Sequence, residues 1–231
     1  MILRQLHQRV ARYFTAKGFF YSLAYRDYLD EIYASFLDRI LEVATLRRVK
    51  TASAALRTIA ETTFSAIIIT DEGLTHSNQQ ALAREVLAKI KAYIENGGLV
   101  IAGLHFPNFS PKDKFRRFFR SFGLPWSDGD YHRTTFQLNP SGLLPERIGA
   151  STLPQPYSMK VLHIKDAGSQ EKLYVPTEGA LTQSHVFPPM RADETQAAVV
   201  GARLGRGYLY YCGDVNWEDG SNQLMLSLCG F

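Results

Sequence analysis

Cysteine is scarce in this chain. Only Cys212 and Cys229 occur among 231 residues, too few for a disulfide framework, and no Cys/His spacing typical of a zinc site accompanies them. This composition favours a reducing compartment, and we expect a cytoplasmic location. No apolar run approaches the roughly 20 residues that a membrane-spanning helix needs, so we predict no transmembrane segment.

Several well-known motifs are also missing. The sequence contains no Walker A loop, no GxGxxG after a strand, no HExxH and no GxSxG. Their absence removes the usual sequence signatures of P-loop NTPases, dinucleotide-binding enzymes, zinc proteases and α/β-hydrolases. We therefore predict neither a cofactor nor a metal site.

Acidic residues are absent from the first 26 positions, although basic and apolar residues recur there. The basic residues are Arg4, Arg9, Arg12, Lys17 and Arg26, and the apolar residues at helical spacing are Leu3, Leu6, Val10 and Phe14. This pattern predicts an N-terminal helix over about residues 1–17 that docks on the domain. It also fits a mitochondrial targeting segment, and both alternatives stay open.

The rest of the composition is that of a globular protein. The hydrophobic fraction of 45% is ample for a core, and the length of 231 residues suits one domain, so we expect a single domain over 1–231. The formal net charge of +4 is mild. Such a charge permits an anionic partner without arguing for one.

Apolar runs alternate with segments of helical periodicity in the first half of the chain. Strands are expected at 19–25, 45–51, 64–70 and 99–106, with helices at 29–41 and 53–61, after Ser77, and from Ser110-Pro111. Strand–helix alternation builds parallel sheets with helices on both faces. The sequence therefore predicts an α/β fold with a flavodoxin-like, mostly parallel sheet.

The strand–helix alternation stops in the second half of the chain, where the sequence predicts antiparallel strands appended to that sheet. We expect strands at 131–138, 197–203 and 207–215, a loop at 139–158, a hairpin over 160–176 and a final helix at 221–230. Helix caps are expected from Ser53, from Ser77 with Gln80, and from Asp219 or Ser221.

Polar side chains follow three of the expected strands. Asp71-Glu72 follows the first, His105 and Asn108 follow the second, and Asp214, Asn216 and Glu218 follow the third. In open parallel sheets, ligands bind at the carboxyl ends of the strands. We therefore predict that these tips converge over one edge of the sheet.

Each of these residues has a candidate role and a simpler alternative. His105 paired with Glu72 or Glu218 is the candidate acid/base group. The candidate ligand-binding residues are Asp71, Asn108, Asp214, Asn216 and Trp217, the last by stacking on a sugar or base. Alternatively, the histidine is satisfied by a backbone carbonyl and the carboxylates only hold turns. A divalent metal on Asp71, His105 and Asp214 would need ligands far apart in sequence, which is weak support.

Three segments carry a resemblance to a known family. FSAIIITDEG, YIENGGLVIAGLHFP and GARLGRGYLYYCGDVNWE resemble the class I glutamine-amidotransferase-like superfamily, and its ThuA-like (trehalose utilisation) branch looks closest. The match covers residues 64–107 and 197–219. It implies the fold and a carbohydrate-related ligand. The C-terminal tail also resembles uncharacterised fungal proteins, which implies no activity.

The resemblance also identifies what the chain lacks. Glutamine amidotransferases place a cysteine nucleophile on the turn after the GGLVIAG-like strand, and a histidine held by a carboxylate moves the proton. Here the turn reads Gly103-Leu104-His105, and the family's His-x-Glu falls on Asn216-Trp217-Glu218. The resemblance therefore implies a pseudoenzyme without glutaminase activity.

Residues 110–123 combine phenylalanines with basic residues. Lys112, Lys114, Arg116, Arg117 and Arg120 form one basic helix face with a single acid, Asp113. The phenylalanine spacing points those rings into the core, so we do not predict a nucleic-acid-binding protein. A solvated face remains the simpler reading.

Two functional hypotheses follow. The first is a small-molecule-binding or hydrolase-like protein of amidotransferase-like fold whose ligand, still unknown, is carbohydrate-related. The second is a non-catalytic scaffold or interaction module, with a protein partner or a second copy of the chain.

Overall fold

The computed structural model describes residues 17–21, 29–76 and 80–231. Its strands are β1 Lys17–Tyr21, β2 Thr45–Val49, β3 Ala66–Ile69, β4 Leu99–Ala102, β5 Ser127–Leu138, β6 Tyr157–Lys165, β7 Lys172–Pro176, β8 Val199–Leu204 and β9 Gly207–Cys212. Its helices are α2 Leu29–Ile32, α3 Ala34–Val43, α4 Ala52–Glu61, α5 Gly73–His76, α6 Gln80–Glu95, α7 Phe106–Phe109, α8 Lys112–Ser121 and α9 Asp219–Cys229, with a 3-10 turn at Ala150–Thr152. The N-terminal segment before Lys17, the end of the first expected strand and the Ser77 cap lie outside these residues.

The described strands form one sheet in the order β2-β1-β3-β4-β9-β8-β7-β5-β6. Strands β2, β1, β3, β4 and β9 are parallel, whereas β8, β7, β5 and β6 pair antiparallel with their neighbours. The parallel half has the flavodoxin-like order. The prediction of a flavodoxin-like sheet with appended antiparallel strands is therefore confirmed.

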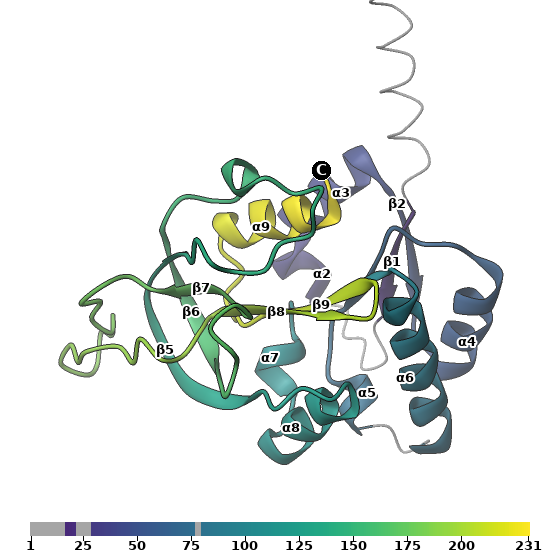
Figure 1. Ribbon diagram of the computed structural model, residues 1–231, viewed down its shortest axis with the longest axis horizontal. Coiled ribbons are helices and arrows are strands. Elements are labelled where there is room, and N and C mark those ends of the chain that lie inside the picture. Colours follow the sequence, from purple (N-terminus) through teal and green to yellow (C-terminus); the bar gives the residue numbers. More distant parts are fainter. Residues whose placement is uncertain (1–16, 22–28, 77–79) are drawn as a thin grey trace, which may run out of the picture.

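The two faces of the sheet carry separate hydrophobic clusters. Ile67 and Ile69 of β3 pack on the side of α4, α6 and α8, while Ile68 packs on the side of α3 and α9. Figure 1 shows these two groups of helices on opposite faces. This alternation explains the continuous apolar run of the sequence, because a strand covered on both faces needs an apolar side chain at every position.

The glycines of two quoted segments lie against each other. The end of α6 and the turn after it accept backbone hydrogen bonds from the β8–β9 turn and from β9. Arg206 N donates to Glu95 O at 3.1 Å, and Tyr208 N donates to Gly98 O at 3.0 Å. A Cβ on Gly207 would lie 2.2 Å from the Gly98 and Ile94 carbonyl oxygens. Only glycine fits this contact, so the Gly-Gly and Gly-x-Gly patterns are one packing feature.

The expected hairpin over 160–176 is wrong. Strand β5 lies between β6 and β7 and pairs with both of them. The turn residues favour a local reversal, but β5 is 12 residues long and offers a longer partner. Its pairing with β6 runs from Ser127 to Phe136.

Two cap predictions are also wrong. Helix α4 begins after Thr51, whose side chain accepts a hydrogen bond from Ala54 N at 3.2 Å, so Thr51 rather than Ser53 is the cap. Helix α9 begins after Glu218, and among the described residues no side chain caps it. Ser221 instead donates to Asp214 at 2.6 Å.

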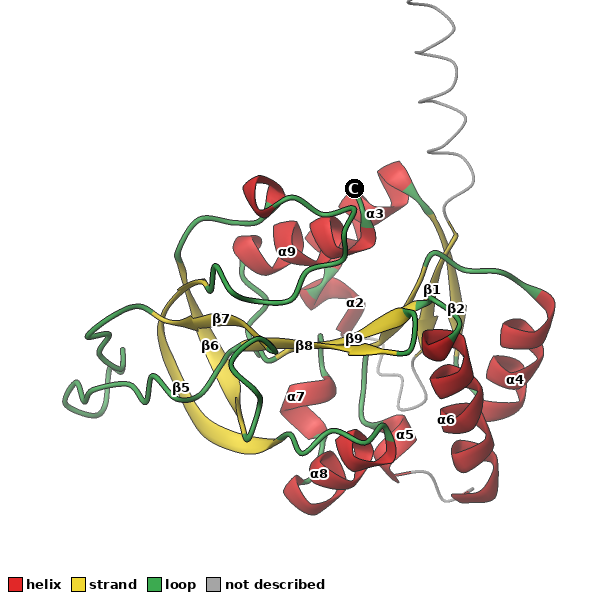
Figure 2. Cartoon of the chain, viewed as in Figure 1, coloured by secondary structure: helices red, strands yellow, loops and turns green. Residues whose placement is uncertain are grey.

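Strand β6 returns to the far end of β9. Leu162 N donates to Gly213 O at 3.0 Å, and Val215 N donates to Lys160 O at 2.9 Å. The antiparallel half therefore curls over the sheet, as the bent β5 in Figure 2 shows. This fold-back buries the segment that follows β9, which the sequence marked as a candidate site.

No helix in the part of the chain that the structure describes is long and apolar enough to cross a bilayer.

Candidate functional site

Three strand ends meet at the carboxyl edge of the parallel sheet. His105 lies two residues after Gly103, the glycine that follows β4. Its backbone N–H donates to Thr70 O at 2.9 Å, and Thr70 directly precedes Asp71. The Asn108 side chain donates to Val215 O at 3.1 Å, directly after Asp214. These two hydrogen bonds connect the segments that follow β3, β4 and β9. The structure thus places the predicted polar segments on one edge.

The turn after β4 keeps a strained backbone conformation. Leu104 has φ = 59°, which a side chain with a Cβ seldom adopts. A strained turn of this kind exposes the nucleophile in hydrolases with a nucleophile elbow. Here the residue is leucine, it is 1% exposed, and it packs in the same cluster as Phe36 and Trp217. The turn therefore projects a hydrophobic side chain into the core.

His105 lies between aromatic rings and is 5% exposed. The ring centroid of Tyr33 lies 4.8 Å away and that of Phe109 5.3 Å away, both edge-on. Asn108 Nδ2 lies 3.3 Å from His105 Nδ1. Asn108 Nδ2 also contacts the Val215 carbonyl, which can only accept a hydrogen bond. The amide NH₂ group therefore donates to Val215 O and to His105 Nδ1.

The amide contact assigns the histidine tautomer. Because Asn108 donates to Nδ1, the neutral His105 ring carries its proton on Nε2. In a Ser-His-Asp type triad the arrangement is reversed: Nδ1–H donates to a carboxylate, and Nε2 is the base. The surroundings of His105 thus differ from those of a triad histidine in both position and polarity.

Asp214 organises the turn that leads into α9. One carboxylate oxygen accepts from the backbone N–H groups of Asn216 and Trp217 at 3.0 Å. The other accepts from Glu218 N at 2.7 Å and from Ser221 Oγ at 2.6 Å. Burial raises the pKa of Asp214 although these donors favour the charged form. The side chain is completely buried and fixes this turn.

Trp217 is packed on both sides and held at its polar end. Its Nε1–H donates to Asn222 Oδ1 at 2.6 Å, and its ring contacts Tyr33 and Phe36 edge-on at 5.5 and 5.4 Å. With 8% exposure it offers little ring area for stacking. Asn216, by contrast, is exposed.

The two carboxylates after β3 are buried. Asp71 is 1% exposed and Glu72 is 6% exposed. Asp71 Oδ1 accepts from Gly73 N at 2.9 Å, and the Glu72 carbonyl accepts from Thr75 N at 2.7 Å. Both residues thus shape the turn into α5, which follows the Thr70 carbonyl that accepts from His105 N.

Glu218 is half-buried and forms an ion pair with Arg133 of β5. Arg133 also donates to Ser158 Oγ at 3.3 Å, so this carboxylate belongs to a polar network of the curled antiparallel half. The structure therefore joins His105, Asn108, Trp217 and Asp71 in one region and engages Glu218 with β5. The sequence around Glu218 does not predict this pairing, because Arg133 is 85 residues away.

Tyr33 is the site residue that the sequence analysis missed. It is 5% exposed and contacts both His105 and Trp217. It occurs within the apolar periodicity of residues 29–41, where a core role accounts for it. A hydroxyl group at one position of an otherwise apolar stripe is the signal that could have identified it.

Metal ligands are not grouped in the described residues. No three His, Cys, Asp or Glu side chains lie close enough there to hold an ion. Two imidazoles, those of His132 and His163, do lie close together, with ring centroids 4.4 Å apart. His163 Nδ1 contacts Asp130 O at 2.9 Å, and burial lowers its pKa to about 4. Two imidazoles fall short of the usual tetrahedral set.

The basic face of α8 is partly neutralised within the chain. Arg116 and Lys112 pair with Asp128 at 2.8 and 3.8 Å, and Arg117 pairs with Asp113 at 2.6 Å. The phenylalanines of this helix are buried, as predicted. The face therefore carries less unbalanced charge than the sequence indicates.

Comparison with known proteins identifies the fold. No family model matches the chain, and no curated protein matches its sequence. Among solved structures, a ThuA-like protein from Parabacteroides merdae aligns with a TM-score of 0.54 and 12% identity, over 93% of this chain and 88% of that one. The predicted likeness to ThuA-like proteins is thereby confirmed for the fold.

Two β-galactosidases also align. The enzyme from Bacillus circulans sp. alkalophilus gives a TM-score of 0.53 at 10% identity over 93% of this chain, and that from Rahnella sp. R3 gives 0.52 at 14% over 94%. The chain spans 31% of the length of each. These likenesses concern the fold alone.

The Asp214 turn gives a direct test of this geometry. Asp214→Asn keeps one acceptor oxygen but places an NH₂ group against the N–H of Glu218, which leaves buried donors unmatched. We expect the free energy of unfolding to fall by about 2 kcal/mol, measured by urea denaturation. Asp219→Asn is the control, because its side chain is 85% exposed and it should change stability by less than about 1 kcal/mol. Equal losses in the two variants would contradict the assigned role.

Proposed function

We propose that this chain is a binding domain of amidotransferase-like fold that does not hydrolyse glutamine. The observation that carries the proposal is Leu104, which occupies the strained turn after β4 and buries its side chain in the core. Amide hydrolysis by this fold's route begins with a nucleophile at that turn. An aliphatic side chain supplies no attacking atom.

The surroundings of His105 support the same conclusion. With its proton on Nε2, the neutral ring has no lone pair there to accept a proton from a nucleophile. The nearest counterpart of the family's glutamate, Glu218, is paired with Arg133. Cys212 offers no replacement nucleophile, because burial raises its pKa to about 12 and keeps it a thiol.

A carbohydrate is the ligand class to test first at the carboxyl edge. The names of the ThuA-like protein and the β-galactosidases point to that class, and backbone and side-chain hydrogen bonds bring together the segments that follow β3, β4 and β9 at this edge. Asn216 is the exposed polar residue of this edge, and a binding role needs no nucleophile. This ligand assignment is independent of the missing glutaminase chemistry.

Glutamine hydrolysis tests the proposal. We expect the purified chain to release no ammonia from glutamine above the buffer control, because the turn after β4 carries a leucine in place of a nucleophile. The measurement is a coupled assay of ammonia with the native chain and with His105→Gln as the matched variant. Release that His105→Gln abolishes would overturn the proposal, and equal traces in both would identify contamination.

A second candidate function is protein interaction, favoured by an exposed apolar segment. We call residues 181–191 the finger. It projects at the left of Figure 1, beyond β5 and β7. Val186, Phe187 and Met190 are 80%, 71% and 67% exposed. Its base is closed by Thr182 N donating to Met190 O at 2.8 Å, so the tip is presented on a defined turn. Apolar groups grouped on a surface mark interaction sites.

Replacing the tip distinguishes an interaction surface from a core element. Val186→Ser with Phe187→Ser should change the free energy of unfolding by less than about 0.5 kcal/mol, because both side chains are already solvated. Retention on a phenyl column should fall. Phe136→Ala is the matched control, since this buried ring should cost about 3 kcal/mol or more. A comparable loss in the finger variant would show that the finger supports the fold instead.

A further inference from the structure

The finger is joined at its base to the antiparallel half of the sheet. Leu181 forms an antiparallel bridge with Arg191, and Gln183 forms one with Arg133 of β5. The Leu181 carbonyl also accepts a hydrogen bond from Thr134 Oγ1 at 2.8 Å. The exposed tip is therefore carried on a fixed support, so a partner that binds it loses less conformational entropy than it would on ordering a free loop.

The backbone donors of the tip are already paired or absent. Ser184 Oγ accepts from Val186 N and from Phe187 N, both at 3.1 Å. The next two residues are prolines, which have no N–H. Met190 N donates to Thr182 Oγ1 at 3.0 Å. Within this described stretch, residues 186–190 thus present no unpaired N–H, and apolar surroundings leave no donor of theirs without a partner.

The backbone acceptors of the tip, by contrast, remain available. No hydrogen bond among the described residues ends on the carbonyl oxygens of residues 185–189. Pro188 has φ fixed at about −65°, and the α region is disfavoured for it because Pro189 follows. These constraints favour polyproline II, in which no carbonyl is bonded internally. The tip is thus rich in acceptors and free of donors, beside exposed apolar side chains.

This imbalance between donors and acceptors distinguishes the possible surroundings of the tip. The hydrocarbon of a membrane would accommodate Val186, Phe187 and Met190 but offers no donor to the carbonyls. Tryptophan and tyrosine side chains combine a flat apolar ring with an N–H or O–H donor. A groove lined by such side chains matches both properties of the tip.

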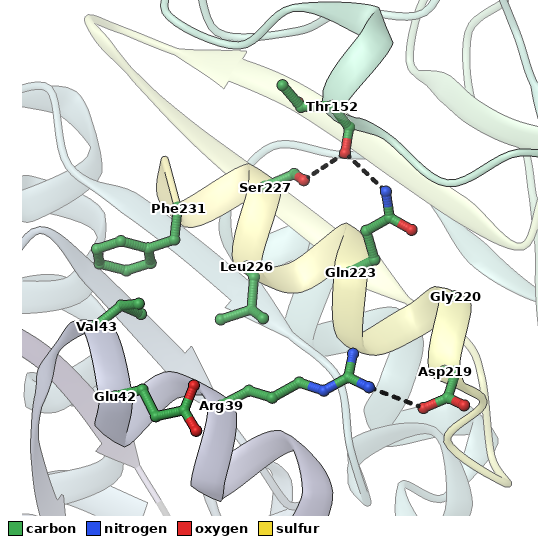
Figure 3. A pocket seen from close by; sticks show the side chains of 10 residues that line it. All are labelled: Arg39, Glu42, Val43, Thr152, Asp219, Gly220, Gln223, Leu226, Ser227 and Phe231. Atoms are coloured by element: carbon green, nitrogen blue, oxygen red, sulfur yellow. Dashed lines mark hydrogen bonds and ion pairs between the residues drawn. The ribbon is translucent and has the colours of Figure 1, made fainter.

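A second copy of the chain offers a less suitable surface. A groove of about 580 Å³ lies between α3 and α9, and Figure 3 shows side chains of both helices pointing into it. Its lining contains neither tryptophan nor tyrosine. Arg39 pairs there with Asp219 at 3.5 Å, and Gln223 Nε2 donates to Thr152 O at 3.1 Å. This groove therefore lacks the aromatic donors that suit the finger.

We propose that the finger binds a proline-recognising domain of another protein, in a groove lined by tryptophan and tyrosine side chains. Pro188 and Pro189 pack on the aromatic rings, and the carbonyls of the tip accept hydrogen bonds from the indole and phenol groups. Phe187 fills an adjoining apolar pocket. This contact rests on the protein-interaction function proposed for the finger and names the class of its partner. It is independent of the binding site at the carboxyl edge.

Titration of the full-length chain with purified domains tests the proposal. The probes are a WW, an SH3 and an EVH1 domain, whose grooves recognise polyproline II segments, and binding is measured by isothermal titration calorimetry. We expect at least one of them to bind with a Kd of about 100 µM or tighter. Pro188→Ala with Pro189→Ala should weaken that binding by about tenfold or more, because the fixed φ angles and the ring contacts are lost.

The matched control removes two exposed prolines outside the finger. Pro140→Ala with Pro156→Ala should leave the Kd within about twofold of that of the native chain. Circular dichroism establishes that each variant is folded. Binding that survives the change at Pro188 and Pro189 would overturn the proposal, and so would the absence of binding by all three domains.

Two further measurements separate failure of this proposal from failure of the interaction surface. Flotation with phosphatidylcholine–phosphatidylserine vesicles detects a membrane as the occupant, and sedimentation of the chain alone detects a second copy. Vesicle binding or self-association that Val186→Ser with Phe187→Ser abolishes, without binding of any domain, would overturn proline recognition but keep the finger as an interaction surface. If this variant also leaves retention on the phenyl column unchanged, both proposals fail.

Discussion

The buried side chain of Leu104 is the constraint on which the carboxyl edge of the sheet depends. Its backbone adopts φ = 59°, and the cost of that conformation is of the order of 1 kcal/mol. Burial of a leucine side chain contributes about 2 kcal/mol, enough to offset this strain. The turn is thus maintained by burial of Leu104 in the core cluster that also contains Phe36 and Trp217.

The polar candidate residues around this turn likewise form hydrogen bonds and ion pairs that hold the structure together. Asp214 accepts four hydrogen bonds from the turn that follows it, and Asn108 connects the segments after β4 and β9. Glu218 pairs with Arg133 of the curled antiparallel strands.

The parallel half of the fold could be predicted because its signals are local. The four-residue run of β3 and the glycine turn after α6 specify strands and helix ends by themselves. The 160–176 hairpin could not be judged in the same way, because β5 competes for both strands through contacts distant in sequence. Thr51 rather than Ser53 caps α4, since neighbouring hydroxyl residues offer the backbone equivalent choices.

The candidate site likewise has features that local sequence predicts and others that depend on distant contacts. That polar residues follow β3, β4 and β9 could be read from the sequence, and the edge at which they meet followed from parallel topology. Their partners could not. The ring of Tyr33 beside His105 and the guanidinium of Arg133 beside Glu218 come from elements whose placement depends on the packing of the whole sheet. Such partners decide whether a titratable group is available for chemistry.

Reactivity of a cysteine placed at position 104 is the most direct measurement of the central claim. The account predicts that the thiol of Leu104→Cys is buried like Cys212 and reacts with an alkylating reagent only when the chain unfolds. Val186→Cys, at a position that is 80% exposed, provides the rate of an exposed thiol for comparison. A thiol at position 104 that reacts in the native chain as fast as that control would show that the turn presents its residue to solvent, as a nucleophile requires, and would contradict the account.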